Sequence, residues 1–183
     1  MKSTILAFSG GIKSGKTTIS SNISSILKWK RVSFGEYIQR IAEKDGIIPS
    51  RDNLQELGEK EIDSGWKNFC FNVLEMVRWK NGENLIIDGI RHKEALDQIK
   101  KITSPSDVYL VFIELDLKNR ESRIVNTENF ENIKRYELHS TEKQVNKVLP
   151  EISDLIIDGN KSIGEITDEI LRWLNEKNGK IYF

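Results

Sequence analysis

The sequence predicts an α/β fold in which a parallel sheet lies between two layers of helices. Five short apolar runs lack the polar alternation of a half-exposed strand, which is typical of parallel strands covered on both faces. Stretches with apolar residues at helical spacing separate these runs. The 183 residues are enough for one substantial core, and no repeat or linker divides them. We therefore expect a single domain of three α/β/α layers.

Each expected strand is a compact apolar segment. In chain order the segments are 4–8, 31–34, 84–88, 108–115 and 154–158. A glycine-rich loop follows the first segment, and Ile19 and Ile23 then recur at helical spacing. Because helices alternate with the strands, right-handed crossovers bring the carboxyl ends of the strands to one edge of the sheet. Ligands should bind along that edge.

Helical patterns fill the segments between the expected strands. The most pronounced of those between the second and third strands carries aromatic residues from Trp66 onward, a stripe that is typical of core packing. We expect Cys70, within this stripe, to be an inert buried thiol. After the third strand, apolar positions between Ala95 and Ile102 predict a crossover helix.

Two capping boxes mark helix starts in the last third of the sequence. Ser162 with Glu165 three residues later predicts the start of the final helix. Thr141 with Gln144 predicts a second, short helix that ends at Pro150.

The composition excludes several classes of protein. Lys and Arg total 28 and Asp and Glu total 28, so no net charge draws the protein to nucleic acid or to an acidic membrane. The single cysteine cannot form an internal disulfide, the N-terminal apolar run is too short for a signal peptide, and no apolar stretch spans a bilayer. We expect a cytoplasmic monomer or homodimer that binds neither nucleic acid nor membrane, and that holds any anion by local chemistry.

The strongest motif is the segment Gly10–Thr17, here called the glycine loop, which fits GxxxxGK[ST]. It follows an expected strand and opens a helix, as a phosphate-binding loop must. Its glycines allow the backbone N–H groups to curl around an anion at the helix N-terminus. Lys16 would reach the terminal phosphates and Thr17 would offer its hydroxyl to Mg²⁺. The expected ATP-binding residues of this segment are Gly10, Gly11, Lys13, Ser14, Gly15, Lys16, Thr17 and Thr18.

Asp88 ends the third expected strand at the same edge of the sheet. In nucleotide-binding proteins with such loops, an acid at this place holds the metal directly or through water. The alternative is that Asp88 and Gly89 are only a turn signal. Arg91 follows three residues later, where it could face a second phosphate.

Several segments together resemble the P-loop kinases of nucleoside and deoxynucleoside monophosphates, the adenylate kinase-like family, with dephospho-coenzyme A kinases as near relatives. These segments are 9–18, 34–37, 54–58, 87–91 and 153–158. The resemblance implies a sheet order of 2-3-1-4-5 and a core made of residues 1–34, 83–116 and 151–183. It also implies a helical insertion over residues 35–82 that binds the acceptor, and a lid over residues 117–150.

The resemblance also assigns residues around the transferred phosphoryl group. The lid would contribute Arg120 and Arg123, which stand three apart and can lean over one site. Planar guanidinium groups suit the charge spread over a transferring phosphoryl. Asn160, in the loop after the fifth strand, would lie near adenine.

The acceptor side departs from the pattern of the family. Similar kinases carry an arginine soon after the glycine that follows strand two, but here Gln39 takes that position and Arg40 follows it. Since one residue turns a helical side chain by about 100°, Arg51 or Arg91 could grip the acceptor instead. The amide of Gln55 could read a base edge. The acceptor-side candidates are Gly35, Arg40, Arg51, Gln55, Arg91 and Arg135.

The resemblance implies ATP-dependent transfer to a nucleoside monophosphate, which gives the diphosphate and ADP. The attacking phosphate oxygen is already ionised, so no side-chain base is required. We expect His92 and His139 to be solvated. One alternative is a kinase that acts on an alcohol, like the dephospho-coenzyme A kinases, with Glu36 as the acid near the acceptor hydroxyl. Another is an ATPase or nucleotide switch without transferase activity.

Overall fold

The five expected strands form one parallel sheet in the order β2-β3-β1-β4-β5, which confirms the predicted topology. This computed structural model describes residues 2–116, 119, 144–145 and 147–179. The strands are β1 (Thr4–Gly10), β2 (Lys30–Ser33), β3 (Leu85–Asp88), β4 (Asp107–Glu114) and β5 (Leu155–Asp158). The carboxyl ends of all five strands therefore point to one edge of the sheet.

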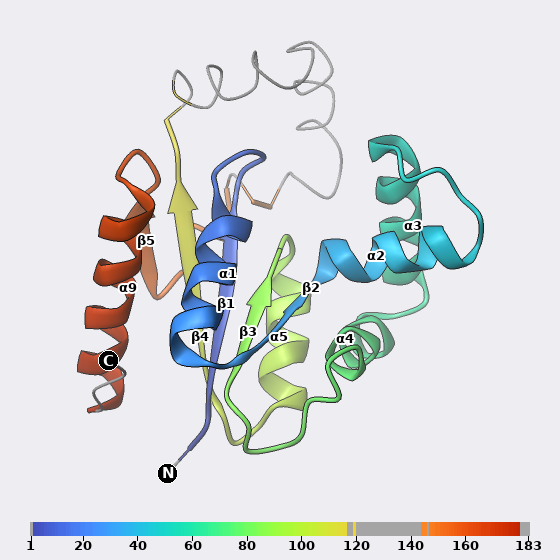
Figure 1. Ribbon diagram of the computed structural model, residues 1–183. Helices are drawn as coiled ribbons and strands as arrows, with labels where there is room; N and C mark the ends of the chain where they lie inside the picture. The colour runs from blue at the N-terminus through green and yellow to red at the C-terminus, as the bar shows by residue number, and fades with distance from the viewer. Residues whose placement is uncertain (1, 117–118, 120–143, 146, 180–183) are drawn as a thin grey trace.

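Helices cover both faces of this sheet. They are α1 (Lys16–Leu27), α2 (Phe34–Lys44), α3 (Arg51–Asp63), α4 (Trp66–Glu75), α5 (Lys93–Ile102) and α9 (Ile163–Asn178). Figure 1 shows α1 and α9 on one face and α5 on the other. Alternate side chains of β1 divide accordingly, since Leu6 and Phe8 pack beneath α1 and α9 while Ile5 and Ala7 belong to the opposite core. The three predicted layers are confirmed.

The helices α2, α3 and α4 form the helical insertion between β2 and β3, and they stand together beside the sheet (Figure 1). Phe69 of α4 joins the insertion, because its ring lies 5.1 Å from that of Phe34 and 5.7 Å from that of Tyr37. Cys70 is fully buried, and burial raises the pKa of its thiol to about 12. The aromatic stripe is therefore core, and Cys70 is the inert thiol that the sequence predicts.

The two predicted capping boxes have different outcomes. Ser162 and Glu165 make both bonds of the box at the start of α9. The described residues between 144 and 150 form turns instead of the predicted helix, and Thr141 lies outside the described residues. The side chain of Gln144 is used elsewhere, since its Oε1 accepts a hydrogen bond from the backbone N–H of Lys93 at the start of α5. The expected short helix is thus wrong for this part of the chain.

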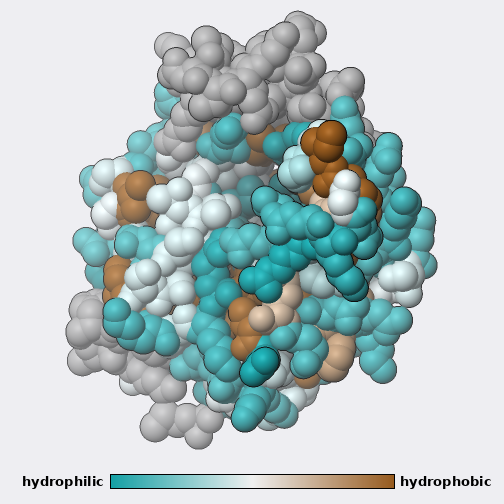
Figure 2. All heavy atoms as spheres, turned by 45° about the vertical axis from the view of Figure 1, so that its right-hand side comes forward, coloured by the Kyte–Doolittle hydropathy of each residue, from teal (hydrophilic) through white to brown (hydrophobic). Residues whose placement is uncertain are grey.

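The described surface is mostly hydrophilic. Figure 2 shows polar residues over most of the visible face, with apolar atoms gathered at a few separate places. The exposed large apolar side chains are Ile26, Ile48, Phe71, Ile156 and Ile163. Among the described helices, none combines the length and the apolar character that a membrane-spanning segment needs.

Candidate functional site

The glycine loop adopts a backbone that depends on its glycines. Gly10 and Gly15 have φ values of 149° and 91°, in the region that side chains disfavour. A Cβ atom on Gly10 would lie 2.6 Å from the carbonyl oxygen of Ile113 in β4, so no larger residue fits there. Lys13 also has a positive φ, 62°, which is unusual for a residue with a side chain.

Helix α1 begins at the end of this loop with its N-terminus uncapped by any side chain. Gly15 is the N-cap residue, and no acidic residue occupies the first turn. The first N–H groups of a helix lack partners within the helix and attract anions. Thr17 and Thr18 are exposed at this terminus, and Ser14 is buried beneath it. Strand, loop and helix N-terminus thus form the anion site that the sequence predicts.

Residues 89–91 bring the end of β3 to the glycine loop. The carbonyl oxygen of Phe8 in β1 accepts hydrogen bonds from the backbone N–H groups of both Gly89 and Ile90. The hydroxyl of Ser9 donates to the carbonyl of Ile90 over 2.7 Å. These bonds fix the chain between Asp88 and Arg91 across the end of β1, directly before the glycine loop.

Three basic side chains from separate elements converge at this edge. Lys16 begins α1, Arg51 begins α3, and Arg91 follows β3, and all three are half-buried. Burial lowers the pKa of Lys16, the charges of Arg91 and Arg51 add to this effect and Asp88 opposes it, and the resulting pKa is about 7. Burial, together with Arg51, lowers the pKa of Arg91 to about 10, so Arg91 stays charged at neutral pH. Such a group of like charges favours a bound anion.

Asp88 is buried beside this group and is held by Arg31. The guanidinium of Arg31 donates from Nη2 to Asp88 Oδ2 over 2.7 Å and from Nη1 to Glu36 Oε1 over 2.6 Å. Its Nε donates to the hydroxyl of Ser20 in α1. Arg31 was not a predicted site residue. The one signal in the sequence is its position two residues before Ser33, which places both side chains on the same side of the edge strand β2.

The residues at this edge fit a magnesium ion. The buried Oδ1 atom of Asp88 has no hydrogen-bond partner among the described residues. A lone carboxylate and the hydroxyl of Thr17 suit Mg²⁺, which takes few protein ligands and completes its shell with phosphates and water. The described part of the chain contains no group of three or more His, Cys, Asp or Glu residues that could hold a metal by themselves.

Gln55 lies one helical turn after Arg51 in α3, so both side chains are on one face of that helix. Its Nε2 atom is buried and has no hydrogen-bond partner within the described residues. A buried amide donor without a partner costs about 1–3 kcal/mol, so a ligand acceptor atom at this place would be stabilising. The contact of Gln55 with the acceptor stays a prediction.

His92 differs from its expected solvated state. It is half-buried, and its ring centroid lies 5.0 Å from that of Trp66 at the start of α4. Burial lowers the pKa of His92, with the charge of Arg91 adding to the effect, while Glu94 opposes it. The aromatic neighbour explains the difference, because the loop-to-helix junction packs against the insertion. His139 lies outside the described residues.

Other predicted residues are not brought into this group or lie beyond the described chain. Arg40 is exposed on α2. Gly35 is exposed as well, but it lies at the sheet edge, since a Cβ atom on Gly89 would lie 3.9 Å from its backbone nitrogen. Asn160 is exposed after β5, where its side chain donates to Asp158 Oδ1 and accepts from Asn119. The lid candidates that lie outside the described residues are Arg120, Arg123 and Arg135.

Comparisons with known proteins agree with this architecture. A family model described as an AAA domain matches residues 6–149. No curated protein sequence matches the chain. Among solved structures, a shikimate kinase from Aquifex aeolicus is similar with 19% identity and a TM-score of 0.60, over 95% of this chain and 98% of that chain.

Two further solved structures share the fold. An APS kinase from Mycobacterium tuberculosis, in complex with AMPPNP and APS, has 16% identity and a TM-score of 0.61, over 95% of this chain and 98% of that chain. A gluconokinase from Sinorhizobium meliloti has 16% identity and a TM-score of 0.58, over 100% of this chain and 96% of that chain. Since the family model covers well over half of the sequence, the protein belongs to this family of AAA domains.

Proposed function

We propose that the protein is a P-loop kinase that transfers the γ-phosphoryl group of ATP to a small anionic molecule. The observation that carries this proposal is the convergence of Lys16, Arg51 and Arg91, whose like charges add to burial in lowering the pKa values of Lys16 and Arg91. One glycine loop accounts for binding of a nucleotide, but it does not account for two more cations on neighbouring elements. A second anion beside the nucleotide explains them.

Each residue has a distinct task in this reaction. The N–H groups of the glycine loop and of the α1 terminus bind the phosphates, and the negative phosphates keep Lys16 protonated. Arg51 and Arg91 hold the anionic group of the acceptor, which aligns its nucleophilic oxygen with the phosphoryl group. Asp88 and Thr17 would hold Mg²⁺, which when bound neutralises charge on the phosphates.

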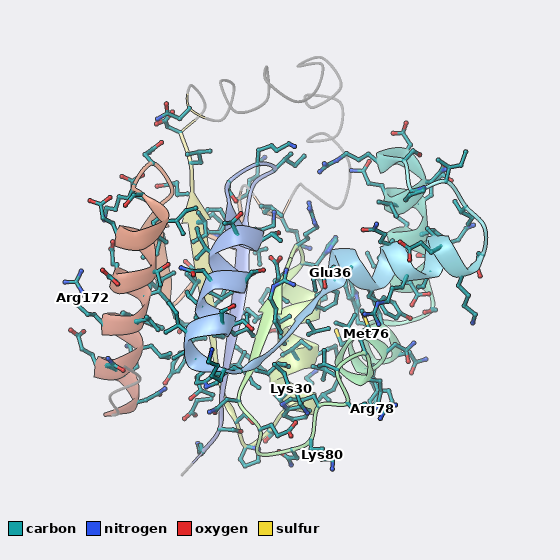
Figure 3. The ribbon with its side chains drawn as sticks, in the orientation of Figure 1. Lys30, Glu36, Met76, Arg78, Lys80 and Arg172 are labelled. Carbon is teal, nitrogen blue, oxygen red and sulfur yellow. The ribbon has the colours of Figure 1, made fainter. Side chains whose placement is uncertain are left out.

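An alcohol is the acceptor class that we propose first. Three similar structures carry the names shikimate kinase, APS kinase and gluconokinase. An alcohol must lose a proton during transfer, and Glu36 at the start of α2 supplies a carboxylate at the same sheet edge, joined to Asp88 through Arg31. Figure 3 shows Glu36 where α2 leaves the sheet.

A nucleoside monophosphate is the second candidate, and one observation favours it. The buried amide of Gln55 lies beside Arg51. An amide that both donates and accepts suits a base edge, while the arginines suit the phosphate of the same molecule.

ADP formation with a panel of acceptors tests the proposal. The panel contains ribo- and deoxynucleoside monophosphates, dephospho-coenzyme A, shikimate, APS and gluconate. We expect ADP to form faster with one acceptor class and to match the phosphorylated acceptor in amount. Equal ADP formation without any acceptor would instead identify an ATPase, and the absence of ATP binding would contradict the proposal as a whole.

A further inference from the structure

Arg31 has the most extensive set of charged contacts near the site, and no role in the proposed reaction has been given to it above. Its side chain is 13% exposed and lies in edge strand β2, between the sheet and α1. The guanidinium contacts three elements: Ser20 of α1 at 3.0 Å, Asp88 of β3 at 2.7 Å and Glu36 of α2 at 2.6 Å. An arginine buried in this way is held in a fixed orientation by its planar set of donors.

The contact with Asp88 decides which carboxylate oxygen is available. Arg31 occupies Oδ2, whereas the buried Oδ1 has no hydrogen-bond partner among the described residues. The Asp88 side chain is only 2% exposed, and Arg31 is the partner that the described residues supply to its Oδ2 atom. Without Arg31, the carboxylate would lose the donor that fixes Oδ2, and its buried charge would lose an ion-pair partner.

The contact with α1 links Arg31 to the nucleotide side. Ser20 accepts from Arg31 Nε and donates through the same hydroxyl to the carbonyl oxygen of Thr17, one helical turn earlier. The contact with Glu36 links Arg31 to the first turn of the helical insertion. One side chain thus joins α1, the end of β3 and the start of α2.

We propose that Arg31 is a positioning residue of the site: it holds Asp88 with Oδ1 directed away from the ion pair and fixes Glu36 in relation to it. Arg31 itself does not touch the reacting atoms. Residues that orient a metal-binding group typically change metal affinity or activity by about 10–100-fold when they are replaced. This inference rests on the proposed function for its catalytic meaning, but its test does not need the acceptor.

The test measures binding of a non-hydrolysable ATP analogue by calorimetry, once with Mg²⁺ and once with EDTA. The dissociation constant in EDTA divided by the dissociation constant with Mg²⁺ gives the contribution of the metal to binding. In Arg31→Met we expect this ratio to fall by about 10-fold or more, while binding in EDTA changes by less than about twofold because the glycine loop is intact. A ratio equal to that of the wild type would overturn the proposal.

A conservative variant separates position from charge. Arg31→Lys keeps the charge, but an ammonium group cannot bind Asp88, Glu36 and Ser20 together. We expect it to fold and still to lose most of the metal contribution. Recovery of the full ratio in Arg31→Lys would show that only the charge matters and would contradict a positioning role. This variant also keeps the test valid if Arg31→Met fails to fold.

A double-mutant cycle locates the effect. If Arg31 acts through Asp88, the variant Asp88→Asn should lower the ratio by itself, and adding Arg31→Met should lower it no further. Additive effects would show that Arg31 acts elsewhere. Arg172→Met is the matched control, because Arg172 is exposed on α9, far from Glu36 in Figure 3. Its ratio should equal that of the wild type.

Failure of this inference can be told apart from failure of the proposed function. If no acceptor supports transfer but Arg31→Met still loses the metal contribution, only the reaction is wrong. If transfer occurs and the variants keep the wild-type ratio, only the role of Arg31 is wrong.

Discussion

We propose that the glycine loop and the helical insertion bind anions by different means. In the glycine loop, backbone conformation makes the site: Gly10 and Gly15 have φ values that a side chain would disfavour, and the uncapped start of α1 faces outward. In the insertion, side chains make the site, since Arg51 and Gln55 project from one face of α3. The first site depends on neighbours in sequence, and the second depends on how α3 packs against the rest of the molecule.

Lys16→Met should have the largest effect and should affect only the nucleotide side. Removal of a charge that contacts the transferring phosphates should lower kcat by at least about 10²-fold. Because burial already disfavours the charged Lys16, the melting temperature of the ligand-free variant should not fall. Steady-state kinetics and thermal unfolding measure the two effects. Lys100→Met on α5 is the control, and a variant that retains more than a tenth of the kcat would contradict the role of Lys16.

Arg91→Ala should weaken the interaction with the acceptor much more than the interaction with the nucleotide. A hydrogen bond to a charged group contributes about 1.5–3 kcal/mol, so the KM of the acceptor should rise by roughly 10–100-fold. The KM of ATP should change far less. The two constants are measured under saturation by the other substrate. An unchanged KM of the acceptor would reject Arg91 as its anchor.

Gln55→Leu tests whether the insertion contacts the acceptor, and its effect should be smaller than that of Arg91→Ala. The variant removes a buried donor that has no partner in the described residues, so the free protein should be as stable as the wild type or more stable. The KM of the acceptor should rise by about 2–10-fold, as expected for one neutral hydrogen bond. Gln39→Leu on the exposed side of α2 is the control. If both variants have the wild-type KM, Gln55 does not contact the acceptor.

Binding of ATP should change the protonation of Lys16, which is the smallest effect and concerns the glycine loop alone. In the free protein the pKa of Lys16 is about 7, so the side chain is mostly neutral at pH 8 and mostly charged at pH 6. Bound phosphates favour the charged form and raise this pKa. Binding at pH 8 should therefore take up protons through Lys16, and binding at pH 6 should take up few.

Calorimetry in buffers with different ionisation enthalpies measures this uptake. Lys16→Arg is the control, because arginine is charged at both pH values. The variant should lack the additional uptake at pH 8. Equal uptake by the wild type and by this variant at pH 8 would show that Lys16 is already charged in the free protein.

The sequence was sufficient to predict the features that depend on residues close to one another along the chain. The glycine loop and the capping box at Ser162 were predicted from local patterns and are present, and the strand order that the family resemblance implied is present as well. The short helix before Pro150 was predicted from the same kind of local pattern, but the described residues between 144 and 150 form turns, and Gln144 binds the start of α5. A capping pattern in the sequence cannot show that the side chain of its Gln residue will bind a backbone N–H group from a distant part of the chain.

The sequence by itself determined the glycine loop, because glycine at positions of positive φ and a lysine beside a helix N-terminus act within a few residues of each other. Only the tertiary structure decided that Arg31 binds Asp88, 57 residues away. It likewise decided that Arg51 comes close enough to Lys16 to lower its pKa. The physical reason is that charges interact through space over a few ångströms, and separation along the chain does not predict that distance.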